Sequence, residues 1–434
     1  MRMIAKLILD KKREGHTLST TEIREFINGF VKGTIPDYQM SALAMAICCR
    51  GMNERETADL TLAMMHSGRC LTWNTPTADK HSTGGVGDKL SLIIQPLAAA
   101  CGVAVPSLTG RGLGLTGGTA DKLETIPGYN ASLSLEDFQR VVAEVGVAMA
   151  LQTDEITPAD KKLYALRDVT GTVASIPLIT GSILSKKLAE GANTLVFDVK
   201  CGRGAFMKTR DEALSLAKSL VSGAQAAGRK SAALVTDMSA PLGFAVGNAN
   251  EVCESLAILE GRDQDRYKEI IDLCVEFAAT MLSLEKGISL DEARQNCRAR
   301  LDDGSALAKF KAMVKSHGGD LDAFAARCKE PTSKFRVQAM QSGYITEIDA
   351  ERVARVAFQL GAGREKAGES IDPLAGVTLA VKCGDRVTVG APLATLETTT
   401  RPDELERTAA DILKAFTFSS EAPAHSSLIL ERIS

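Results

Sequence analysis

The run KHSTGGVGDK, from Lys80 to Lys89, combines glycines with side chains that bind anions. Its three glycines allow backbone conformations and close approaches that side chains would block. Lys80, Ser82 and the accessible backbone N–H groups can therefore surround an oxyanion. A helix is expected to follow with Ser91 in its opening turn, where unpaired N–H groups and the helix dipole favour negative charge. The run is neither the G-x-x-x-x-G-K-[ST] phosphate loop nor the G-x-G-x-x-G dinucleotide motif, so it predicts a different kind of anion pocket.

A second glycine-rich stretch, TGRGLGLTGGTADKLE, begins at Thr109. Thr109 follows a strand-like segment, and the hydroxyls of Thr109 and Thr119 lie on either side of the glycines. We interpret this stretch as a second wall of the same anion pocket. Its charged residues are expected to form ion pairs that hold the loop: Arg111, Asp121, Lys122 and Glu124.

Ser182 and Lys186 are four residues apart in a segment with a helical pattern, so they share one face of the expected helix. A hydroxyl and an ammonium on one face suit the edge of a pyrimidine, and Arg167 would add a planar donor to that edge. Spacing alone favours a simpler interpretation, a solvated helix face. These residues therefore do not establish a binding site by themselves.

His81 stands inside the first glycine-rich loop. A lone histidine is more often structural than catalytic, but beside a phosphate pocket it can protonate or hydrogen-bond a leaving base. The sequence offers no second and third ligand near it, so we expect no metal there.

The elements that must position these residues change in character along the chain. The first 65 or so residues have helical periodicity, with an apolar stripe at Ile4, Leu7 and Ile8 and a capping-box spacing from Ser19 to Glu22. From Asp79 short apolar runs alternate with helices, which indicates an α/β domain with a largely parallel or mixed sheet. Residues 158–191 return to a helical pattern and are expected to pack with the N-terminal helices.

In the last third, segments 343–349 and 377–396 contain short alternating strands that resemble the half-barrel of lipoyl or biotinyl domains, without the modified lysine. The predicted fold class is therefore a multidomain α+β and α/β protein. It would have a small all-α domain formed from two chain segments, a large α/β domain with a mixed sheet, and a C-terminal half-barrel-like α+β part. The expected bounds are 1–66 with 159–190, 76–152 with 193–330, and 331–434.

Composition restricts the classes of partner. A chain of 434 residues exceeds one ordinary hydrophobic core, and its formal net charge of −3 gives no general attraction to nucleic acid or anionic membranes. No run of about 18 apolar residues and no signal peptide is evident, so a cytoplasmic location is expected. The ten cysteines lack metal-binding or C-x-x-C spacing, and we expect each to be buried, without disulfides.

Several long motifs together resemble the thymidine phosphorylase and pyrimidine-nucleoside phosphorylase family. They are KHSTGGVGD, TGRGLGLTGGTADKLE, YALRDVT, SIPLITGSILSKKLAEG and DVKCGRGAFM, and they occur in the family's order. The resemblance extends over nearly the whole chain, including the barrel-like C-terminal part. Several extended motifs in the right order are far more specific than a single glycine-rich loop.

The resemblance implies a cleft between the all-α and α/β domains that closes on the substrates, and a homodimer that pairs through the α domains. By position, the implied phosphate-binding residues are Lys80, Ser82, Ser91, Thr109 and Thr119. The implied base-binding residues are His81, Arg167, Ser182 and Lys186, with His81, Arg167 and Lys186 as catalytic candidates. The implied apolar wall is Leu113, Val173, Ile179 and Phe206.

The implied reaction is the reversible phosphorolysis of thymidine or deoxyuridine, with uridine as a further candidate. Phosphate attacks C1′ as the glycosidic bond loosens, which gives the free base and an α-sugar 1-phosphate with inversion at C1′. Donors aimed at the base oxygens stabilise the negative charge that grows on the departing base. Inorganic phosphate is a co-substrate, and no cofactor is expected.

Four positions depart from the family pattern. Thr109 replaces a usual Ser, Leu115 a usual His, Gly181 a usual Ala, and Ser107 a larger Met or Lys close to the sugar. These departures keep the family resemblance and leave the preferred nucleoside open.

Some relatives bind an extra cation near the positions of Gly87, Leu242, Ala245 and Glu254. Here Lys89 follows Asp88, and we expect its ammonium to occupy that place, so no metal is expected.

Two other interpretations stand beside this one. The first is an enzyme of the same wider fold, either a nucleoside-monophosphate phosphorylase, which usually has an extra N-terminal domain, or a phosphoribosyltransferase, which needs paired acidic residues for magnesium. The second is a catalytically weak relative kept as a binding protein. The presence of Arg167, Ser182, Lys186 and the Lys80–Ser82 run favours the phosphorylase.

Overall fold

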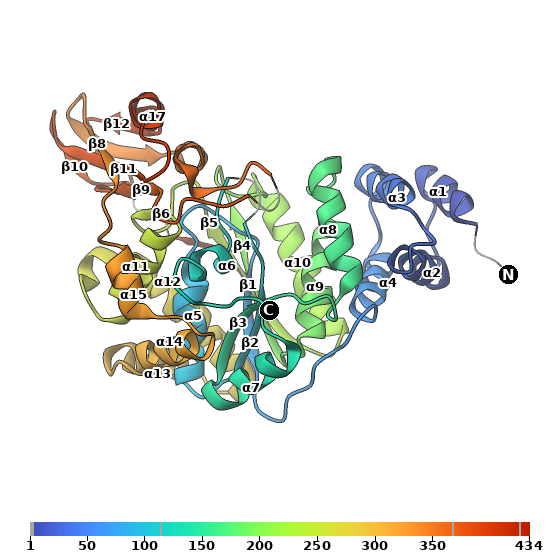
Figure 1. Ribbon diagram of the computed structural model, residues 1–434. Coiled ribbons are helices and arrows are strands. Elements are labelled where there is room, and N and C mark those ends of the chain that lie inside the picture. The colour runs from blue at the N-terminus through green and yellow to red at the C-terminus, as the bar shows by residue number, and fades with distance from the viewer. Residues whose placement is uncertain (1–3, 113–114, 367–368, 425–426) are drawn as a thin grey trace.

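The computed structural model describes residues 4–112, 115–366, 369–424 and 427–434, and its elements fall into three groups (Figure 1). A helical group lies to one side, a sheet flanked by helices occupies the centre, and a smaller part with short strands lies above the sheet. Within the described residues, no helix is long and apolar enough to cross a membrane.

The helical group combines two separate segments of the chain. Its helices are α1 (Ala5–Arg13), α2 (Thr20–Val31), α3 (Asp37–Arg50), α4 (Glu54–Met65), α8 (Pro158–Thr170) and α9 (Ile176–Ala189). Phe26 and Phe30 of α2 share one buried cluster with Leu163 of α8 and Leu178 of α9. The small all-α domain built from two segments is therefore present as predicted.

Helix α2 begins at the residue that its capping sequence predicts. Ser19 accepts a hydrogen bond from the backbone of Glu22 while the Glu22 side chain bonds back to Ser19, so α2 starts at Thr20 as the capping-box spacing predicted. Only part of the apolar stripe predicted at Ile4, Leu7 and Ile8 is buried against other residues of the chain. Ile8 is buried, whereas Ile4 and Leu7 remain about 60% exposed.

The central sheet is mixed, as predicted. Its strands are β1 (Ala78–Ser82), β2 (Val105–Thr109), β3 (Val147–Leu151), β4 (Thr194–Cys201), β5 (Lys230–Asp237) and β13 (Ile429–Ile433). A parallel bridge between Thr77 and Ala104 joins the β2–β3 pair to the other strands, which gives the order β3-β2-β1-β4-β5-β13. All neighbours are parallel except β13, which runs antiparallel to β5.

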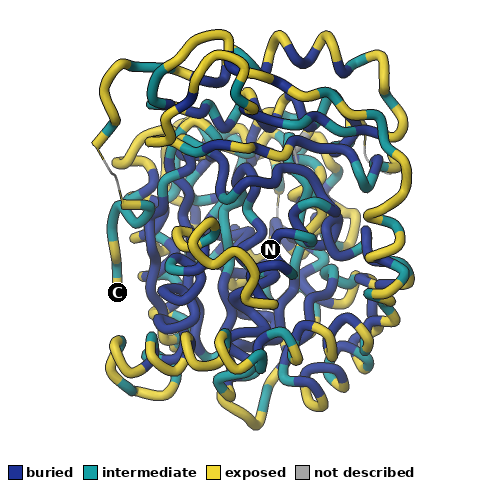
Figure 2. The backbone as a smooth tube through the Cα atoms, turned by 90° about the vertical axis from the view of Figure 1, so that its left-hand side faces the viewer, coloured by how far each residue is buried: buried dark blue, intermediate teal, exposed yellow. Residues whose placement is uncertain are grey.

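Helices cover both faces of this sheet, and Figure 2 shows the sheet and its flanking helices as mostly buried. The helices of this α/β part of the chain are α5 (Leu90–Ala100), α6 (Thr119–Leu123), α7 (Leu135–Val145), α10 (Arg210–Ala226), α11 (Ala249–Leu259), α12 (Gln264–Lys286), α13 (Leu290–Asp302), α14 (Ser305–Ser316) and α15 (Leu321–Arg327). On one side, α9 and α10 form a cluster with Phe197 and Val199 of β4. On the other side, Leu90 of α5 and Phe277 of α12 belong to the largest core.

The C-terminal part combines two small antiparallel sheets with helices, which is an α+β arrangement. Its elements are β6 (Ala245–Gly247), β7 (Ser333–Gln338), β8 (Gly343–Ile348), α16 (Ala350–Ala357), the π-helical η1 (Phe358–Ala362), β9 (Gly376–Leu379), β10 (Arg386–Val387), β11 (Pro392–Thr398), α17 (Glu404–Leu413) and β12 (Phe416–Ser419). The sheet orders are β6-β9-β11-β7 and β10-β8-β12. Because β6 belongs to the first of these sheets, the C-terminal part is joined directly to the α/β domain.

The prediction that every cysteine is buried is wrong. Cys201, Cys274 and Cys297 are buried, whereas the remaining cysteines are partly or fully exposed. The partly or fully exposed cysteines lie on outer faces of helices, at helix ends or in loops and turns, where a small side chain is tolerated. Two pairs also approach each other: the Sγ atoms of Cys253 and Cys328 are 3.2 Å apart, and those of Cys101 and Cys297 are 4.0 Å apart.

Hydrogen peroxide should convert Cys253 and Cys328 into a disulfide before it links any other pair. Cys328 is exposed, and the hydrogen bond from Cys253 lowers its pKa, so its thiolate attacks the peroxide and releases water. The Cys253 thiol then displaces a second water, and the two thiols together lose two hydrogens. Mass spectrometry should show a loss of about 2 Da mapped to this pair.

In a Cys253→Ser variant the loss should disappear, and Cys328 should gain oxygen instead. Cys383→Ser, which changes an exposed cysteine of the C-terminal part, is the matched control and should behave like the parent chain. Prior linkage of Cys101 to Cys297 would contradict the prediction.

Candidate active site

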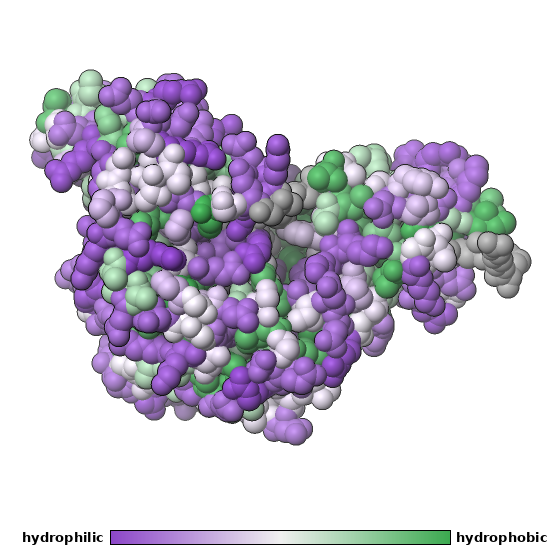
Figure 3. All heavy atoms as spheres, in the orientation of Figure 1, coloured by the Kyte–Doolittle hydropathy of each residue, from purple (hydrophilic) through white to green (hydrophobic). Residues whose placement is uncertain are grey.

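A cleft of about 1080 Å³ lies at the carboxyl ends of the parallel strands, between the α/β domain and helices α8 and α9. Figure 3 shows the surface hollowed between the large body and the helical group. Parallel α/β sheets commonly bind ligands at this edge. The residues predicted to bind ligands that line the cleft are Lys80, His81, Ser82, Ser91, Thr109, Thr119, Arg167, Val173, Ile179, Ser182, Lys186 and Phe206. Leu113 lies outside the described residues.

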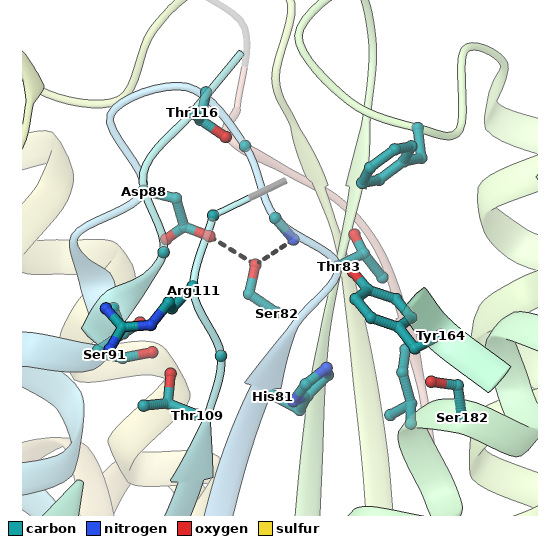
Figure 4. A pocket seen from close by; sticks show the side chains of 18 of the residues that line it. His81, Ser82, Thr83, Asp88, Ser91, Thr109, Arg111, Thr116, Tyr164 and Ser182 are labelled. Atoms are coloured by element: carbon teal, nitrogen blue, oxygen red, sulfur yellow. Dashed lines mark hydrogen bonds between the residues drawn. The ribbon is translucent and has the colours of Figure 1, made fainter. Parts of the chain in front are cut away.

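Strand β1 divides this cleft into two sides. Successive side chains of a strand point to opposite faces of the sheet, so Lys80 lies on one face and Asp79 with His81 on the other. The Lys80 ammonium lies 5.5 Å from the ring centre of Phe277 in α12, whereas Asp79 forms an ion pair with Lys187 of α9. Figure 4 shows Ser82 in the middle, with Ser91 and Thr109 on one side and Ser182 on the other.

Hydroxyl groups gather on the side of the cleft with Lys80, Ser91 and Thr109, which is called the anion side after the sequence prediction. Ser82 donates a hydrogen bond to Asp88 and accepts one of 3.1 Å from the backbone N–H of Gly84. Ser91 lies in the first turn of α5, and Thr109 ends β2, as the sequence predicted. Thr119 begins α6. Asp88 belongs to the KHSTGGVGDK motif, but no role of its own was predicted for it.

Lys80 is buried and paired with acidic groups. Its Nζ lies 3.0 Å from Asp198 Oδ2 and 3.9 Å from Asp88 Oδ1. Burial alone would lower the pKa of Lys80, but the charges of Asp198 and Asp88 raise it above its ordinary value. Lys80 therefore carries a permanent positive charge at the floor of the anion side.

The second glycine-rich loop is held by its own charged residues, as predicted. Asp121 Oδ2 accepts hydrogen bonds from the N–H groups of Gly112 and Gly118, at 2.6 Å and 2.9 Å. Arg111 pairs with Glu124 and lies 3.5 Å from Asp121. Glycine is required at Gly118, since an added Cβ would lie 2.4 Å from the carbonyl oxygen of Gly110.

Lys122 fastens this loop to the rest of the α/β domain. Its Nζ lies 3.2 Å from Glu251 of α11 and donates to the carbonyl oxygens of Asp88 and Gly117, each at 3.1 Å. The two glycine-rich loops therefore share one buried cation.

Ser182 and Lys186 lie on one face of α9, as predicted, and their side chains are in contact. Lys186 Nζ donates to Ser182 Oγ at 2.9 Å and to Asp160 Oδ2 of α8 at 2.5 Å. It also lies 5.6 Å from the ring centre of Tyr164. Burial lowers the pKa of Lys186, and the charge of Asp160 opposes that effect. Sequence reasoning missed Asp160, because only the packing of α8 on α9 brings it to Lys186.

Arg167 lies in α8 and lines the cleft, and its side chain supports the turn that follows the helix. Its guanidinium donates to the backbone carbonyls of Thr172, Val173 and Leu178, at 3.1, 2.7 and 3.0 Å. These bonds fix the connection between α8 and α9. Only N–H groups not used in these bonds are available to a ligand.

His81 is half-buried at the carboxyl end of β1 and lines the cleft. Burial lowers the pKa of His81 well below its usual value, and the charges of Lys187 and Lys186 lower it further. The ring is therefore neutral at pH 7 and offers one N–H donor and one acceptor.

Helix α9 is fastened to the sheet by a buried network of charges. Lys187 Nζ lies 2.5 Å from Asp79 and 2.9 Å from Glu190, and it donates to the Leu108 carbonyl at 2.9 Å. Glu190 also accepts a hydrogen bond from the N–H of Leu108. This network sets the position of Lys186, the preceding residue of α9, relative to β1 and β2. No spacing rule pointed to it.

Three of the positions that depart from the family pattern have different surroundings in the structure. Gly181 fits a close contact between α9 and α4, since an added Cβ would lie 2.9 Å from Met64 Cε. Ser107 is buried at the cleft floor and accepts a 2.8 Å hydrogen bond from Gln95. Leu115 lines the cleft and is partly buried. Phe206 is 49% exposed in the loop after β4, so the apolar wall is open on that side.

Lys89 takes the position expected for its ammonium. Its Nζ donates to the carbonyl oxygens of Leu242 and Ala245, both at 3.0 Å, and lies 3.3 Å from Glu254. An internal cation thus ties the end of the first glycine-rich loop to α11 and the segment before it.

Comparison with known proteins agrees with this architecture. Residues 6–68 match the helical bundle domain of a glycosyl transferase family, and residues 74–307 match the a/b domain of that family. Residues 344–419 match the pyrimidine nucleoside phosphorylase C-terminal domain. A pyrimidine-nucleoside phosphorylase of Geobacillus stearothermophilus is 48% identical over 402 residues, which cover 91% of this chain and 92% of that protein. This chain belongs to the pyrimidine-nucleoside phosphorylase family.

A second relative of this family, from Bacillus subtilis (strain 168), is 46% identical over 402 residues, with 91% of this chain and 92% of that protein covered. Among solved structures, an anthranilate phosphoribosyltransferase from Thermus thermophilus matches with a TM-score of 0.58 and 19% identity, over 73% of this chain and 99% of that chain. That likeness is one of fold. As a member of the family, this chain is a pentosyltransferase.

The depressed pKa of His81 predicts how stability depends on pH. Below a pH of about 6.5 the unfolded chain takes up a proton at His81, whereas the folded chain does so only at lower pH. The unfolded state therefore gains stability as the pH falls from 6.5 toward the folded pKa. Thermal unfolding should show a smaller drop in Tm from pH 7.5 to 5.5 in His81→Gln than in the parent chain.

His16→Gln, which alters an exposed ring between α1 and α2, is the matched control and should keep the parent's pH dependence. An unchanged pH dependence in His81→Gln would contradict the lowered pKa of His81.

Proposed function

We propose that this enzyme catalyses the reversible phosphorolysis of pyrimidine nucleosides. The observation that carries the proposal is the division of one cleft by β1, with Lys80 and the hydroxyls on one side and the Ser182–Lys186 face of α9 beside His81 on the other. An oxyanion site and a base-binding face are thereby separated by the width of one strand. The relatives that carry the name pyrimidine-nucleoside phosphorylase support the same substrate class.

Phosphate would be held on the anion side by Lys80, Ser82, Ser91, Thr109 and Thr119. The Ser82 hydroxyl, which donates to Asp88 in the structure, would turn toward a phosphate oxygen. The backbone N–H of Ser91, in the first turn of α5, would add a donor, because the first turn of a helix has no intrahelical acceptor for such groups.

The base would be held by His81, Arg167, Ser182 and Lys186. Lys186 would point its ammonium at a base oxygen, and Asp160 would keep it oriented. Neutral His81 would donate its N–H to the second base oxygen. Val173, Ile179 and Phe206 would pack against the ring.

The reaction then follows from charge. As phosphate attacks C1′ from the opposite face, the bond from C1′ to the base nitrogen breaks and its electron pair passes to the base. The fixed positive charge of Lys186 and the N–H groups of Arg167 and His81 stabilise that anion better than they stabilise the bound nucleoside. Inversion at C1′ gives an α-sugar 1-phosphate, and closure of the cleft would exclude water.

Thymidine and deoxyuridine are the proposed substrates, with uridine as a further one. The direct test is base release from thymidine, deoxyuridine, uridine and cytidine, each with and without inorganic phosphate. Phosphate-dependent release of thymine or uracil is the expected result. No release from any of the four would overturn the proposal.

Lys186→Ala should lower kcat/KM for phosphorolysis by about 100-fold or more, since it removes a preorganised charge beside the leaving base. Tm should also fall, because Lys186 is the ion-pair partner of buried Asp160, so kcat/KM is compared at a temperature at which the variant is folded. Lys218→Ala, on an exposed position of α10, is the matched control. Near-normal kcat/KM in Lys186→Ala would remove Lys186 from the mechanism.

We also propose that the enzyme is a cytoplasmic homodimer that pairs through α1 and α3. Ile4 and Leu7 of α1 are 58% and 60% exposed, and Tyr38 and Met45 of α3 are 74% and 44% exposed. Hydrophobic atoms are visible at this end of the molecule in Figure 3. Helices α1 and α3 pack against each other, and a group of large exposed apolar side chains on neighbouring helices is typical of an interaction surface.

Light scattering after size exclusion should give twice the chain mass for the parent chain. Leu7→Glu should shift the equilibrium to monomer by placing charges in the interface. Val389→Glu, at an exposed apolar residue of the C-terminal part, is the control and should remain dimeric. A monomeric parent chain would contradict the proposed assembly.

A further inference from the structure

Behind Lys80 lies a second ammonium that does not reach the cleft. Lys200 is two residues after Asp198 on β4, so the two side chains project from the same face of the strand. Both side chains have no solvent exposure. Lys80 lines the cleft, whereas Lys200 is absent from its lining.

The two ammoniums share one carboxylate oxygen. Asp198 Oδ2 lies 3.0 Å from Lys80 Nζ and 2.8 Å from Lys200 Nζ. The other oxygen, Oδ1, accepts a 2.7 Å hydrogen bond from Thr236 of β5. Neither ammonium makes a well-directed hydrogen bond to any residue that the structure describes. Their contacts with Asp198 are therefore mainly Coulombic.

Because two ammoniums share Asp198, this carboxylate neutralises less of the positive charge on Lys80. If Asp198 faced Lys80 alone, the pair would be nearly neutral toward an incoming anion. With Lys200 on the same oxygen, the group of three carries a net positive charge, and Lys80 is the member of the group that lines the cleft. Burial weakens the screening of that charge, because little water lies between the groups.

Asp88 experiences the same positive charge. Burial alone would raise the pKa of Asp88, but the charges of Lys80 and Lys200 and the hydrogen bond from Ser82 hold it below its usual range. The carboxylate therefore stays ionised next to the anion side. The second ammonium offsets part of the repulsion that Asp88 would exert on a bound anion.

A purely structural role for Lys200 is the alternative, in which it only neutralises buried Asp198. Lys80 already lies at ion-pair distance from that carboxylate, so Asp198 would keep a partner without Lys200. Two like charges at one oxygen also repel each other. Burying these three charges costs more electrostatic free energy than burying one ion pair. This cost favours a functional reason for the second ammonium.

We propose that Lys200 is a positioning residue of the phosphate site, which keeps Lys80 free to bind phosphate by sharing the charge of Asp198. This inference rests on the proposed phosphorolysis. Lys200 acts through Lys80 and touches neither substrate. Its removal should weaken phosphate binding and spare nucleoside binding.

The test is Lys200→Met, which shortens the unbranched side chain by one atom and removes its charge. Initial rates with phosphate varied at saturating thymidine should give a KM for phosphate at least about 10-fold higher than in the parent chain. The KM for thymidine at saturating phosphate should stay within about 2-fold. The Tm without phosphate should be unchanged or higher, because a repulsion between like charges is removed.

A binding measurement without turnover gives the second readout. Inorganic phosphate should raise the Tm of the parent chain, since a ligand that binds only the folded state stabilises it. The same phosphate concentration should raise the Tm of Lys200→Met much less. Lys200→Arg, which restores the charge, should return both the KM for phosphate and the Tm shift toward the parent values.

Lys12→Met is the matched control. Lys12 is also a buried lysine with one acidic partner, Glu56 at 2.9 Å, but it lies in the helical group. Its loss should lower Tm without changing the KM for phosphate. If Lys200→Met does not fold, Lys200→Gln provides the same neutral test with a polar side chain.

The outcomes separate the two proposals. A parent chain without phosphate-dependent turnover would overturn the proposed function itself. An active parent chain with an unchanged KM for phosphate in Lys200→Met, or with equal rises in both KM values, would overturn the role of Lys200 and leave phosphorolysis standing.

Discussion

The alternation of side chains along β1 is the constraint on which the cleft depends. Neighbouring residues of a strand must face opposite sides of the sheet, so the short strand β1 contributes side chains to both sides of the cleft. Asp79 and His81 face α9, whereas Lys80 lies above α12. A one-residue slip in the pairing of β1 with β4 would exchange the two sets. The parallel register beside β4 therefore matters more to this site than any single side chain.

Buried charges give the cleft its geometry. Lys187, Asp79 and Glu190 fix α9 to the sheet, and Lys89 and Lys122 fix the glycine-rich loops to α11. Buried ion pairs add little net stability, because removing charges from water is costly, but they hold directions that apolar packing leaves loose. A cleft that must aim donors at two substrates benefits from that directionality.

The sequence predicted what depends on local pattern. The helical and α/β groups, the strand ending at Thr109, Ser91 in the first turn of α5 and the shared face of Ser182 and Lys186 could all be read from spacing. Contacts between distant residues could not. Asp160 is 26 positions from Lys186, and Asp79 is 108 positions from Lys187. The prediction that the cysteines are buried also failed, because a small apolar residue is tolerated on outer helix faces, at helix ends and in turns as well as in the core.

Strand β13 adds a consequence for how the chain is made. It forms the outer edge of the sheet by pairing with β5, yet residues 238–428 separate the two strands. During synthesis the edge of β5 leaves the ribosome long before its neighbour exists, and an uncovered edge strand can pair with other chains. The sheet can be finished only after the C-terminal part has emerged. Translation speed and chaperone access over that interval would then influence how much of the chain reaches the native state.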